Sequence, residues 1–549
     1  MKFLDTLPLA LTPLSPIHIG CGEDFEPTHY VIDDGLLYGF DPARAMLPEH
    51  LGKRLGELGD KADLLGIQRF FREHSAHFTP FADTLIPVAQ GLAADYKKQV
   101  GQVANREGNG KFAINLLSIE RTSHTGGQPY IPGSSFKGAL RTAWLDRLNN
   151  GQRVTDPDER RNVSKLEKRL FDGDFATSPL RLIKPSDLMP VGDIARQVLY
   201  AVNLKKDRVL DKATGQERLP RGVVARKECI QPGQFRAFTG SLTLQDLLGQ
   251  TDPDPRKRTT PAPSLRLNDI AQLAHATNRY HLPRLRAEIQ QLDQRGQVSP
   301  AWKKAIETLL TAEIGPLLDS GRAMLIRLGR YGGAESKTLS GEGVAQIKIM
   351  QGNGQPAIYE SHTRTVWLAA ETSNDRKHLL PFGWTLVEID PQGELPQLRA
   401  WCQQQAAARP DMDAIRQRFA AERAAAAARA AQQHAERQAA EAAEQARQAA
   451  AAERAARLQT LSANLQAVET FIDECRKRHE QLRGGKDKPN TTYHAKANAL
   501  ARLAHEESGW TQEEKTAAAD AIEAWLPQIV AIDAKEIRKK LKLAALRGQ

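Results

Sequence analysis

Apolar and polar positions alternate in short runs along the first 400 residues, and helical stretches separate these runs. The apolar run Leu9–Ile19 is punctuated by prolines, which predicts an early strand near a sheet edge. Two apolar runs flank an Asp-Asp-Gly turn in Tyr30–Phe40 and predict a hairpin. A longer apolar pattern, Gly222–Leu244, has Pro-Gly at its centre and predicts a second hairpin. The pattern is typical of an α+β protein.

Further strand and helix signals recur on both sides of a segment rich in proline and charge, Thr251–Ser264. Before it, the strand candidate Phe112–Arg121 leads through a glycine-rich loop into the helix candidate Phe136–Leu148. After it come helix candidates at Leu265–Leu292 and Pro300–Leu310. We therefore predict two related α+β modules, residues 1–250 and 265–400.

The composition changes abruptly after Pro410. Residues Phe419–Leu458 are nearly all Ala, Glu, Arg and Gln, the strongest helix formers, without the large apolar positions of a coiled-coil seam. This predicts a solvated helical arm at 411–460, in which the stretch Phe419–Leu458 alone would extend about 60 Å. An apolar face from Leu461 to Ile472 and a capping box at Thr511 predict a small all-helical module over 461–549.

Charge and cysteine content narrow the partner classes. The formal net charge of +10 over 549 residues favours a polyanionic partner such as RNA or DNA. The four cysteines lie far apart with no C-x-x-C pair, so neither a zinc site nor a disulfide framework is predicted, and no cofactor is expected. No apolar run is long enough for a bilayer and the N-terminus is a poor signal peptide, which predicts a cytoplasmic protein without a membrane partner.

The first candidate for chemistry is the turn and helix start in Tyr130–Leu148. Helix N-termini carry unpaired N–H groups and favour anions. The predicted phosphate-binding residues here combine backbone approach, hydroxyls and cations: Gly133, Ser134, Ser135, Lys137 and Arg141. The alternative is a capped helix whose basic residues lie in water.

The second candidate is the glycine-rich basic loop Arg327–Gly343. It is not a nucleotide P-loop, because Ser336 precedes Lys337 where that motif requires glycine. Flexible backbone, cations and an aromatic ring for stacking suit an RNA strand better. The predicted RNA-binding residues are Arg330, Tyr331, Gly332, Gly333, Lys337 and Thr338. The alternative is a plain surface turn.

The third candidate is Leu14–Asp33, where a predicted strand ends in a tight turn at Gly20 and Gly22. His18 is either a general base, an RNA contact or a structural histidine. Nothing in the spacing of the nearby acidic residues demands catalysis, and we predict His18, Gly20 and Gly22 as RNA contacts.

Taken together, the three segments resemble the RAMP superfamily of CRISPR-associated RNA-binding proteins. The order "PLSPIHIGCGE", "YIPGSSFKGALRTA" and "GRYGG" followed by "SKT" is most similar to the crRNA 3′-end subunit of type III-A Csm effector complexes. The resemblance covers about residues 5–390 and says nothing of the arm or the helical module.

The resemblance implies two ferredoxin-like βαββαβ modules with glycine-rich loops. It implies a subunit that caps the crRNA 3′ end, contacts target RNA indirectly, and binds other Csm subunits, chiefly the repeated backbone subunit. A part in crRNA maturation, with recruitment of host nucleases, is also implied.

Three functions remain open at this stage. The first is the non-catalytic RNA-binding subunit, which has no equivalent of the backbone subunit's catalytic acid. The second is a RAMP endoribonuclease that processes precursor crRNA, with His18 or His124 as general acid or base. The third is an interaction scaffold built on the arm and tail. A type III-B subunit is an alternative to the type III-A one.

Overall fold

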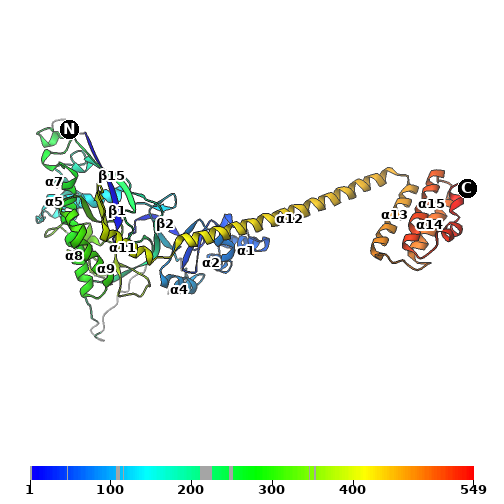
Figure 1. Cartoon of the computed structure of the whole chain (residues 1–549), viewed down its shortest axis with the longest axis horizontal. Coiled ribbons are helices and arrows are strands. Elements are labelled where there is room, and N and C mark those ends of the chain that lie inside the picture. Colours follow the sequence, from blue (N-terminus) through cyan, green and yellow to red (C-terminus); the bar gives the residue numbers. More distant parts are fainter. Residues whose placement is uncertain are drawn as a thin grey trace. The chain divides into compact units, whose positions relative to one another are not determined.

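The computed structural model describes residues 3–45, 47–106, 112–114, 117–210, 215, 225–246, 251–344, 346–351 and 354–549. The chain divides into two compact units, Met1–Ala426 and Ala427–Gln549. Figure 1 shows a mixed α/β unit that contains the N-terminus, the long helix α12 (Met412–Thr460), and a unit of helices that ends at the C-terminus. Among the described helices, none is long and apolar enough to cross a membrane.

Two larger sheets organise the first unit. The first sheet has the order β11 (Ile183–Pro185), β15 (Phe238–Gln245), β1 (Leu4–Pro13), β21 (Trp384–Ile389), β16 (Ala323–Arg327), with β12 (Met189–Pro190) also on β15. The second has the order β2 (Gly20–Phe25), β8 (Ile119–Thr122), β14 (Ala225–Ile230), β13 (Arg196–Lys205), β19 (Thr365–Ala370), β20 (Leu380–Pro381). Each sheet combines strands from both sides of residues 251–264.

Smaller sheets complete the first unit. One consists of β3 (Tyr30–Asp33), β4 (Leu36–Gly39) and β5 (Thr84–Pro87). The two-stranded pairs are β6 (Val103–Arg106) with β7 (Phe112–Ile114), β9 (His124–Thr125) with β10 (Gln128–Pro129), and β17 (Ile347–Ile349) with β18 (Ile358–Glu360).

The helices of the first unit surround these sheets. They are α1 (Glu49–Asp60), α2 (Leu64–Glu73), α3 (Ser75–Phe78), α4 (Gln90–Gln99), α5 (Gly133–Asn149), α6 (Pro157–Arg161), α7 (Val163–Leu170), α8 (Ile270–Gln294), α9 (Pro300–Leu309), α10 (Gly315–Asp319) and α11 (Pro396–Ala407). The predicted helices near Phe136–Leu148, Leu265–Leu292 and Pro300–Leu310 are therefore confirmed as α5, α8 and α9.

The two faces of the first sheet line two different cores, because side chains alternate along each strand. Leu9 and Leu11 of β1 join α5 and the first turns of α8 in one cluster. Leu325 of β16 and Trp384 of β21 join strands β13 and β19 of the second sheet in the other. The first sheet is thus buried between helices and the second sheet.

The prolines predicted that the early strand lies near a sheet edge, and this prediction is wrong. β1 is central, with β15 on one side and β21 on the other. Its pairing with β21 begins at Leu9, and the carbonyl oxygen of Pro8 accepts from the Asp390 N–H at 2.8 Å. Pro8 therefore lacks its donor only where this ladder ends, so a proline is tolerated in a central strand.

One predicted hairpin is confirmed and the other is wrong. Tyr30 pairs with Gly39 and Asp33 with Leu36, as the Asp-Asp-Gly turn predicts. In the second, residues 222–224 lie outside the described part, and the strands on either side of Pro232 enter different sheets, β14 in the second and β15 in the first. Alternation identifies a strand, but its partner is chosen by the core that it helps to bury.

The arm begins as part of the first unit. Phe419 of α12 is 5% exposed and its ring centroid lies 5.7 Å from that of Tyr38 on β4. From there the helix continues with side chains that are mostly exposed, as the composition predicts. The helical module is also confirmed, with α13 (Ala463–Leu482), α14 (Thr492–Glu506), α15 (Gln512–Ile529), α16 (Ala534–Lys540) and α17 (Leu543–Leu546) around a core of its own. The capping box at Thr511 and Glu514 is present.

Candidate nucleic-acid interface

Two of the three candidate segments contact each other at Gly329. The N–H of Arg330 donates to the carbonyl oxygen of His18 at 2.9 Å. Gly329 has φ +82°, and a Cβ atom there would overlap with that same carbonyl. Only glycine permits both the positive φ and this close approach. The glycine-rich loop is therefore anchored on the strand end that carries His18.

The His18 side chain is fully buried beneath this contact, at 0% exposure. Its Nδ1 lies 2.8 Å from the carbonyl oxygen of Glu228, and its Nε2 lies 3.5 Å from a Glu120 carboxylate oxygen. Burial lowers the pKa of His18 despite these two neighbours. The arrangement favours the structural reading of His18 over an RNA contact or a general base, because the imidazole is closed off from solvent.

Glu120 is the centre of a charged cluster at the same place. It forms ion pairs with Lys227 and with Arg330. Partial burial by itself would raise the pKa of Glu120, but the hydrogen bond and charge of Lys227 outweigh it and hold the pKa below its usual range. Gly20 closes over this carboxylate, since a Cβ atom there would overlap with Glu120. Gly22, at φ +86°, has no neighbour within 4 Å of such an atom.

The backbone of Arg330 is fixed by its hydrogen bond to His18, but most of its side chain is accessible to solvent. Its side chain is 59% exposed even though the guanidinium contacts Glu120. Lys337 is exposed as well, and among the described residues its ammonium has no ion-pair partner. A phosphate chain can reach Lys337 without breaking an ion pair, and it can reach the exposed part of Arg330 if the guanidinium is shared with Glu120.

Tyr331 is partly buried. Its ring lies 5.0 Å from that of Trp367 and 5.2 Å from that of Phe382, and the Lys227 ammonium lies 5.8 Å from the Tyr331 ring centroid. These contacts occupy much of the ring. The predicted base stacking therefore has a smaller free surface available than the sequence suggests.

The rest of the loop borders a cavity of about 670 Å³ between α8 and the ends of β13 and β19. Gly332 is buried, and Gly333 has φ +74°. The carbonyl oxygen of Thr338 accepts from the Tyr280 hydroxyl at 2.7 Å, so this residue supports the loop through its backbone.

Charges of both signs line the cavity. The Lys206 ammonium pairs with Glu335 at 2.6 Å, and the Arg327 guanidinium pairs with Glu288 at 2.9 Å. Arg284 donates to carbonyl oxygens, including that of Glu335 at 3.1 Å, and has no carboxylate partner among the described contacts. The cavity wall therefore carries a net positive charge.

At the start of α5, groups of the protein itself occupy the backbone amides that a phosphate would need. The N–H of Gly133 donates to a carboxylate oxygen of Asp187 at 2.7 Å, and a Cβ atom on Gly133 would lie 2.8 Å from the carbonyl oxygen of Ser186. The N–H of Ser135 donates to the carbonyl oxygen of Pro132 at 3.0 Å, whereas Ser134 is exposed. An anion is already present where the phosphate was predicted.

The two predicted cations of α5 are also constrained. The Nε of Arg141 donates to Glu167 at 2.8 Å, and a second nitrogen pairs with the other oxygen of that carboxylate. Partial burial lowers the pKa of Lys137, and the charge of nearby Lys184 adds to the effect. The local geometry therefore resembles the alternative reading, a capped helix with part of its charge neutralised.

The glycine-rich loop reaches α5 at the opposite end. The side chain of Asn149 donates to the carbonyl oxygen of Ser340 at 3.2 Å, and the N–H of Val154 donates to that of Glu342 at 3.2 Å. A 17-residue helix is about 25 Å long, so the predicted residues at its start are well separated from this loop. The candidate residues thus form two surfaces rather than one.

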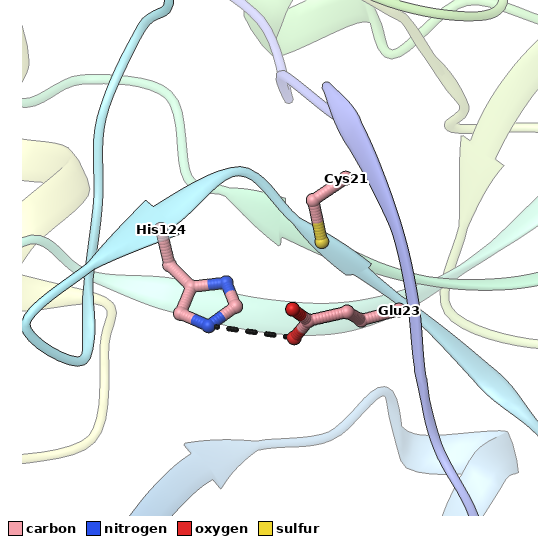
Figure 2. Close-up of side chains that lie close together, drawn as sticks. All are labelled: Cys21, Glu23 and His124. Atoms are coloured by element: carbon pink, nitrogen blue, oxygen red, sulfur yellow. Dashed lines mark ion pairs between the residues drawn. The ribbon is translucent and has the colours of Figure 1, made fainter.

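The sequence reasoning missed one group of side chains, Cys21, Glu23 and His124, shown in Figure 2. Cys21 and Glu23 lie on β2 and His124 lies on β9, about 100 positions further along the sequence. The pairing of Gly20 with Thr122 brings the two segments together. No spacing rule covers such a group, and only the strand register reveals it.

A family model for the RAMP superfamily matches residues 10–241. That range includes the segment around His18 and the whole of α5, while the glycine-rich loop lies outside it.

Two curated relatives are both described as "CRISPR system Cms protein Csm5". The one from Streptococcus thermophilus is 28% identical over 165 residues, which are 29% of this chain and 45% of the relative. The one from Methanocaldococcus jannaschii is 25% identical over 184 residues, 32% of this chain and 40% of the relative. The matched part thus spans less than half the length of each curated relative.

Two solved structures are also similar. A chain of "Cryo-EM structure of Csm-crRNA-target RNA ternary complex in type III-A CRISPR-Cas system" is 15% identical with a TM-score of 0.39, covering 70% of this chain and all of that chain. The "Crystal structure of T.onnurineus Csm5" is 16% identical with a TM-score of 0.32, covering 59% of this chain and 89% of that chain. The family match and the curated relatives agree with the resemblance of the three motifs: residues 10–241 match the RAMP superfamily, and about a third of the chain is similar to the two Csm5 proteins.

Proposed function

We propose that this protein is a non-catalytic crRNA-binding subunit of a type III-A Csm effector complex. In this role it caps the crRNA 3′ end and takes part in crRNA maturation for antiviral defence. The names of the curated relatives and the RAMP match support membership of such a complex. The partners in this proposal are crRNA, target RNA indirectly, the repeated backbone subunit, other Csm subunits and host nucleases, all in the cytoplasm.

The observation that carries the proposal is the glycine-rich loop anchored at His18. Arg330 and Lys337 are exposed on it, and the neighbouring cavity wall is net positive. Cations and backbone amides contact the sugar-phosphate chain and carry little base information. That chemistry suits a protein that must accept a guide of any sequence.

The non-catalytic part of the proposal is supported by the state of His18, one of the two predicted acid–base residues. A general base must reach the proton that it abstracts, directly or through one water. His18 is fully buried and its Nδ1 contacts a backbone carbonyl oxygen. Incubation of the purified protein with labelled repeat RNA in the absence of metal tests this part, and specific cleavage would contradict it.

The order of the first sheet supports one ferredoxin-like module. Strands β11, β15, β1 and β21 are neighbours in that order with antiparallel pairing. α5 is one of the elements between β1 and β11 in the chain, and α8 lies between β15 and β21. We propose this as the first of two such modules, with the second built around the sheet that contains β13.

The decisive experiment uses the complex assembled with Arg330→Ala and Lys337→Ala together. We expect loss of crRNA 3′-end protection, read as a broader and shorter distribution of guide lengths in the purified complex. The matched control is Arg437→Ala with Arg447→Ala, which removes two exposed cations from α12. A guide distribution unchanged in the first variant, with the complex intact, would overturn the assignment of this loop.

A further inference from the structure

Cys21, Glu23 and His124 gather on one surface, as Figure 2 shows. One ligand atom from each residue, a sulfur, an oxygen and a nitrogen, lies within 4.8 Å of the other two. Cys21 and Glu23 lie on β2 where its register against β8 shifts, between Gly20 and Asp24, and both side chains lie beside His124. His124 approaches from β9, at the first position of the short hairpin formed by β9 and β10.

We propose that these three side chains bind a Zn²⁺ ion. Zinc in proteins prefers sulfur, imidazole nitrogen and carboxylate oxygen, which are the three donors present here. The proposal is independent of RNA binding and of the Csm assignment. It also revises the expectation from cysteine spacing, which considered only pairs of cysteines close in the sequence.

The distances suit a tetrahedral ion. Two donors that each lie about 2.1 Å from zinc at a tetrahedral angle are about 3.4 Å apart. The Nε2 of His124 lies 3.6 Å from a carboxylate oxygen of Glu23. The sulfur of Cys21 lies within 4.8 Å of both donor atoms. Its thiol donates to the carbonyl oxygen of Arg121 at 3.6 Å, and binding of the ion would replace that hydrogen bond.

The orientation of His124 provides an independent sign. Its Nδ1 lies 3.1 Å from the carbonyl oxygen of Thr122. When Nδ1 carries the proton and donates it to this oxygen, the lone pair of Nε2 points at the shared space. Metal-binding histidines are typically held in this way by a carbonyl or carboxylate on the other nitrogen.

Charge balance favours a divalent ion. Cys21 loses its thiol proton to solvent on binding, and the thiolate and the Glu23 carboxylate then neutralise Zn²⁺. A guanidinium nitrogen of Arg121 lies 3.3 Å from the Glu23 oxygen that faces His124, so Arg121 competes for that oxygen. Because Glu23 has a second carboxylate oxygen, it can contact Zn²⁺ and the Arg121 guanidinium at the same time.

The fourth corner faces solvent. Glu23 is 60% exposed and Cys21 is also exposed, so water or a group from a partner completes the coordination. The ion would connect β2 to the β9–β10 hairpin, and the chain continues from that hairpin directly into α5. Zinc is therefore expected to stiffen the approach to the α5 N-terminus.

The test uses the full chain, freed of metal by a chelator and kept reduced by a phosphine. We expect one equivalent of Co²⁺ to bind, with a thiolate-to-cobalt charge-transfer band and visible bands of tetrahedral strength, and Zn²⁺ to displace it. Loss of an outer-shell partner alone costs about 10–100-fold in metal affinity, so Cys21→Ser or His124→Gln should cost at least about tenfold. Cys21→Ser should also abolish the charge-transfer band.

Cys475→Ser is the matched control, because Cys475 is a free cysteine in the other unit. It should bind Co²⁺ as the unmodified protein does. Since Cys21 and Glu23 are exposed, Glu23→Gln serves as a second variant that retains the thiol and the fold. Equal Co²⁺ affinity in the unmodified protein and in Cys21→Ser, or a charge-transfer band that survives Cys21→Ser, overturns the site.

Discussion

The start of α5 and the loop Arg327–Gly343 have similar compositions but differ in how far their cations are neutralised and exposed. Both combine glycines with cations in a short stretch, two at the start of α5 and three in the loop. At α5, Asp187 occupies the first amide and Glu167 pairs with Arg141. In the loop, Arg330 also pairs with a carboxylate, that of Glu120, but its side chain is 59% exposed, and Lys337 has no described ion-pair partner.

The difference shows what a basic motif can establish. Charge and glycine spacing are local properties, but neutralisation is a tertiary one. Asp187 and Glu167 lie 54 and 26 positions from the groups that they contact. A cation already paired in the folded protein offers less to a phosphate, because the existing pair must be broken or shared.

The largest expected effect is on the anchor of the loop. Gly329→Ala adds a Cβ atom that overlaps with the His18 carbonyl in a residue with φ +82°, so we expect a loss of about 3 kcal/mol in unfolding free energy. Gly22→Ala is the matched control, at φ +86° with no neighbour within 4 Å, and should cost about 1 kcal/mol. Urea unfolding measures both. Equal losses would mean that the contact with His18 contributes nothing beyond backbone strain.

The second largest expected effect is a loss of unfolding free energy at acidic pH. The loop rests on α8 through Tyr280, and the adjacent His281 is fully buried with no hydrogen-bond partner for either ring nitrogen in the described structure. Burial, together with the charges of Arg284 and Arg327, lowers the pKa of His281 to about 3. Between that value and 6.5 the unfolded chain binds a proton that the folded chain does not, so stability falls as pH falls below 6.5.

For a single such histidine the loss is about 2 kcal/mol between pH 7 and pH 5. His281→Phe keeps an aromatic ring beside Trp384 and removes the proton-binding group. It should flatten the pH dependence by about that amount, measured by urea unfolding at both pH values. An unchanged pH slope in this variant would show that other groups, such as His18, dominate the acid response.

The smallest expected effect tests whether the ion pair between Glu167 and Arg141 limits RNA binding by α5. Glu167→Gln should cost under about 1 kcal/mol, since the pair with Arg141 is partly exposed. It frees one cation, so the salt dependence of binding to single-stranded RNA should steepen by about 0.7 in the log–log slope. Glu159→Gln breaks a comparable pair with Arg169 and serves as control. Identical slopes for both variants would mean that the start of α5 does not face RNA.

Much of the local structure was predictable. The Asp-Asp-Gly hairpin, helices α5, α8 and α9, the arm and the capping box at Thr511 follow from turn chemistry, periodicity and helix propensity. The failures concern pairing. β1 is central despite Pro8, and β14 and β15 flank a Pro-Gly turn without pairing with each other. Strand partners depend on burial across the whole unit, which a local pattern does not contain.

The candidate site divides in the same way. The residue types and the segments that carry them were evident from the sequence, as was the resemblance to RAMP proteins that the family match supports. The burial of His18, the partly occupied ring of Tyr331 and the meeting of Cys21 with His124 were not.

By itself, the sequence determined which segments are helices, turns and flexible glycine-rich stretches, because those preferences act over a few neighbouring residues. Only the tertiary structure decided which cations have no ion-pair partner and which histidine side chains are buried in the core. It also decided which thiol lies beside an imidazole. Those properties depend on contacts between residues that are distant along the chain, and such contacts exist only once the sheets are assembled.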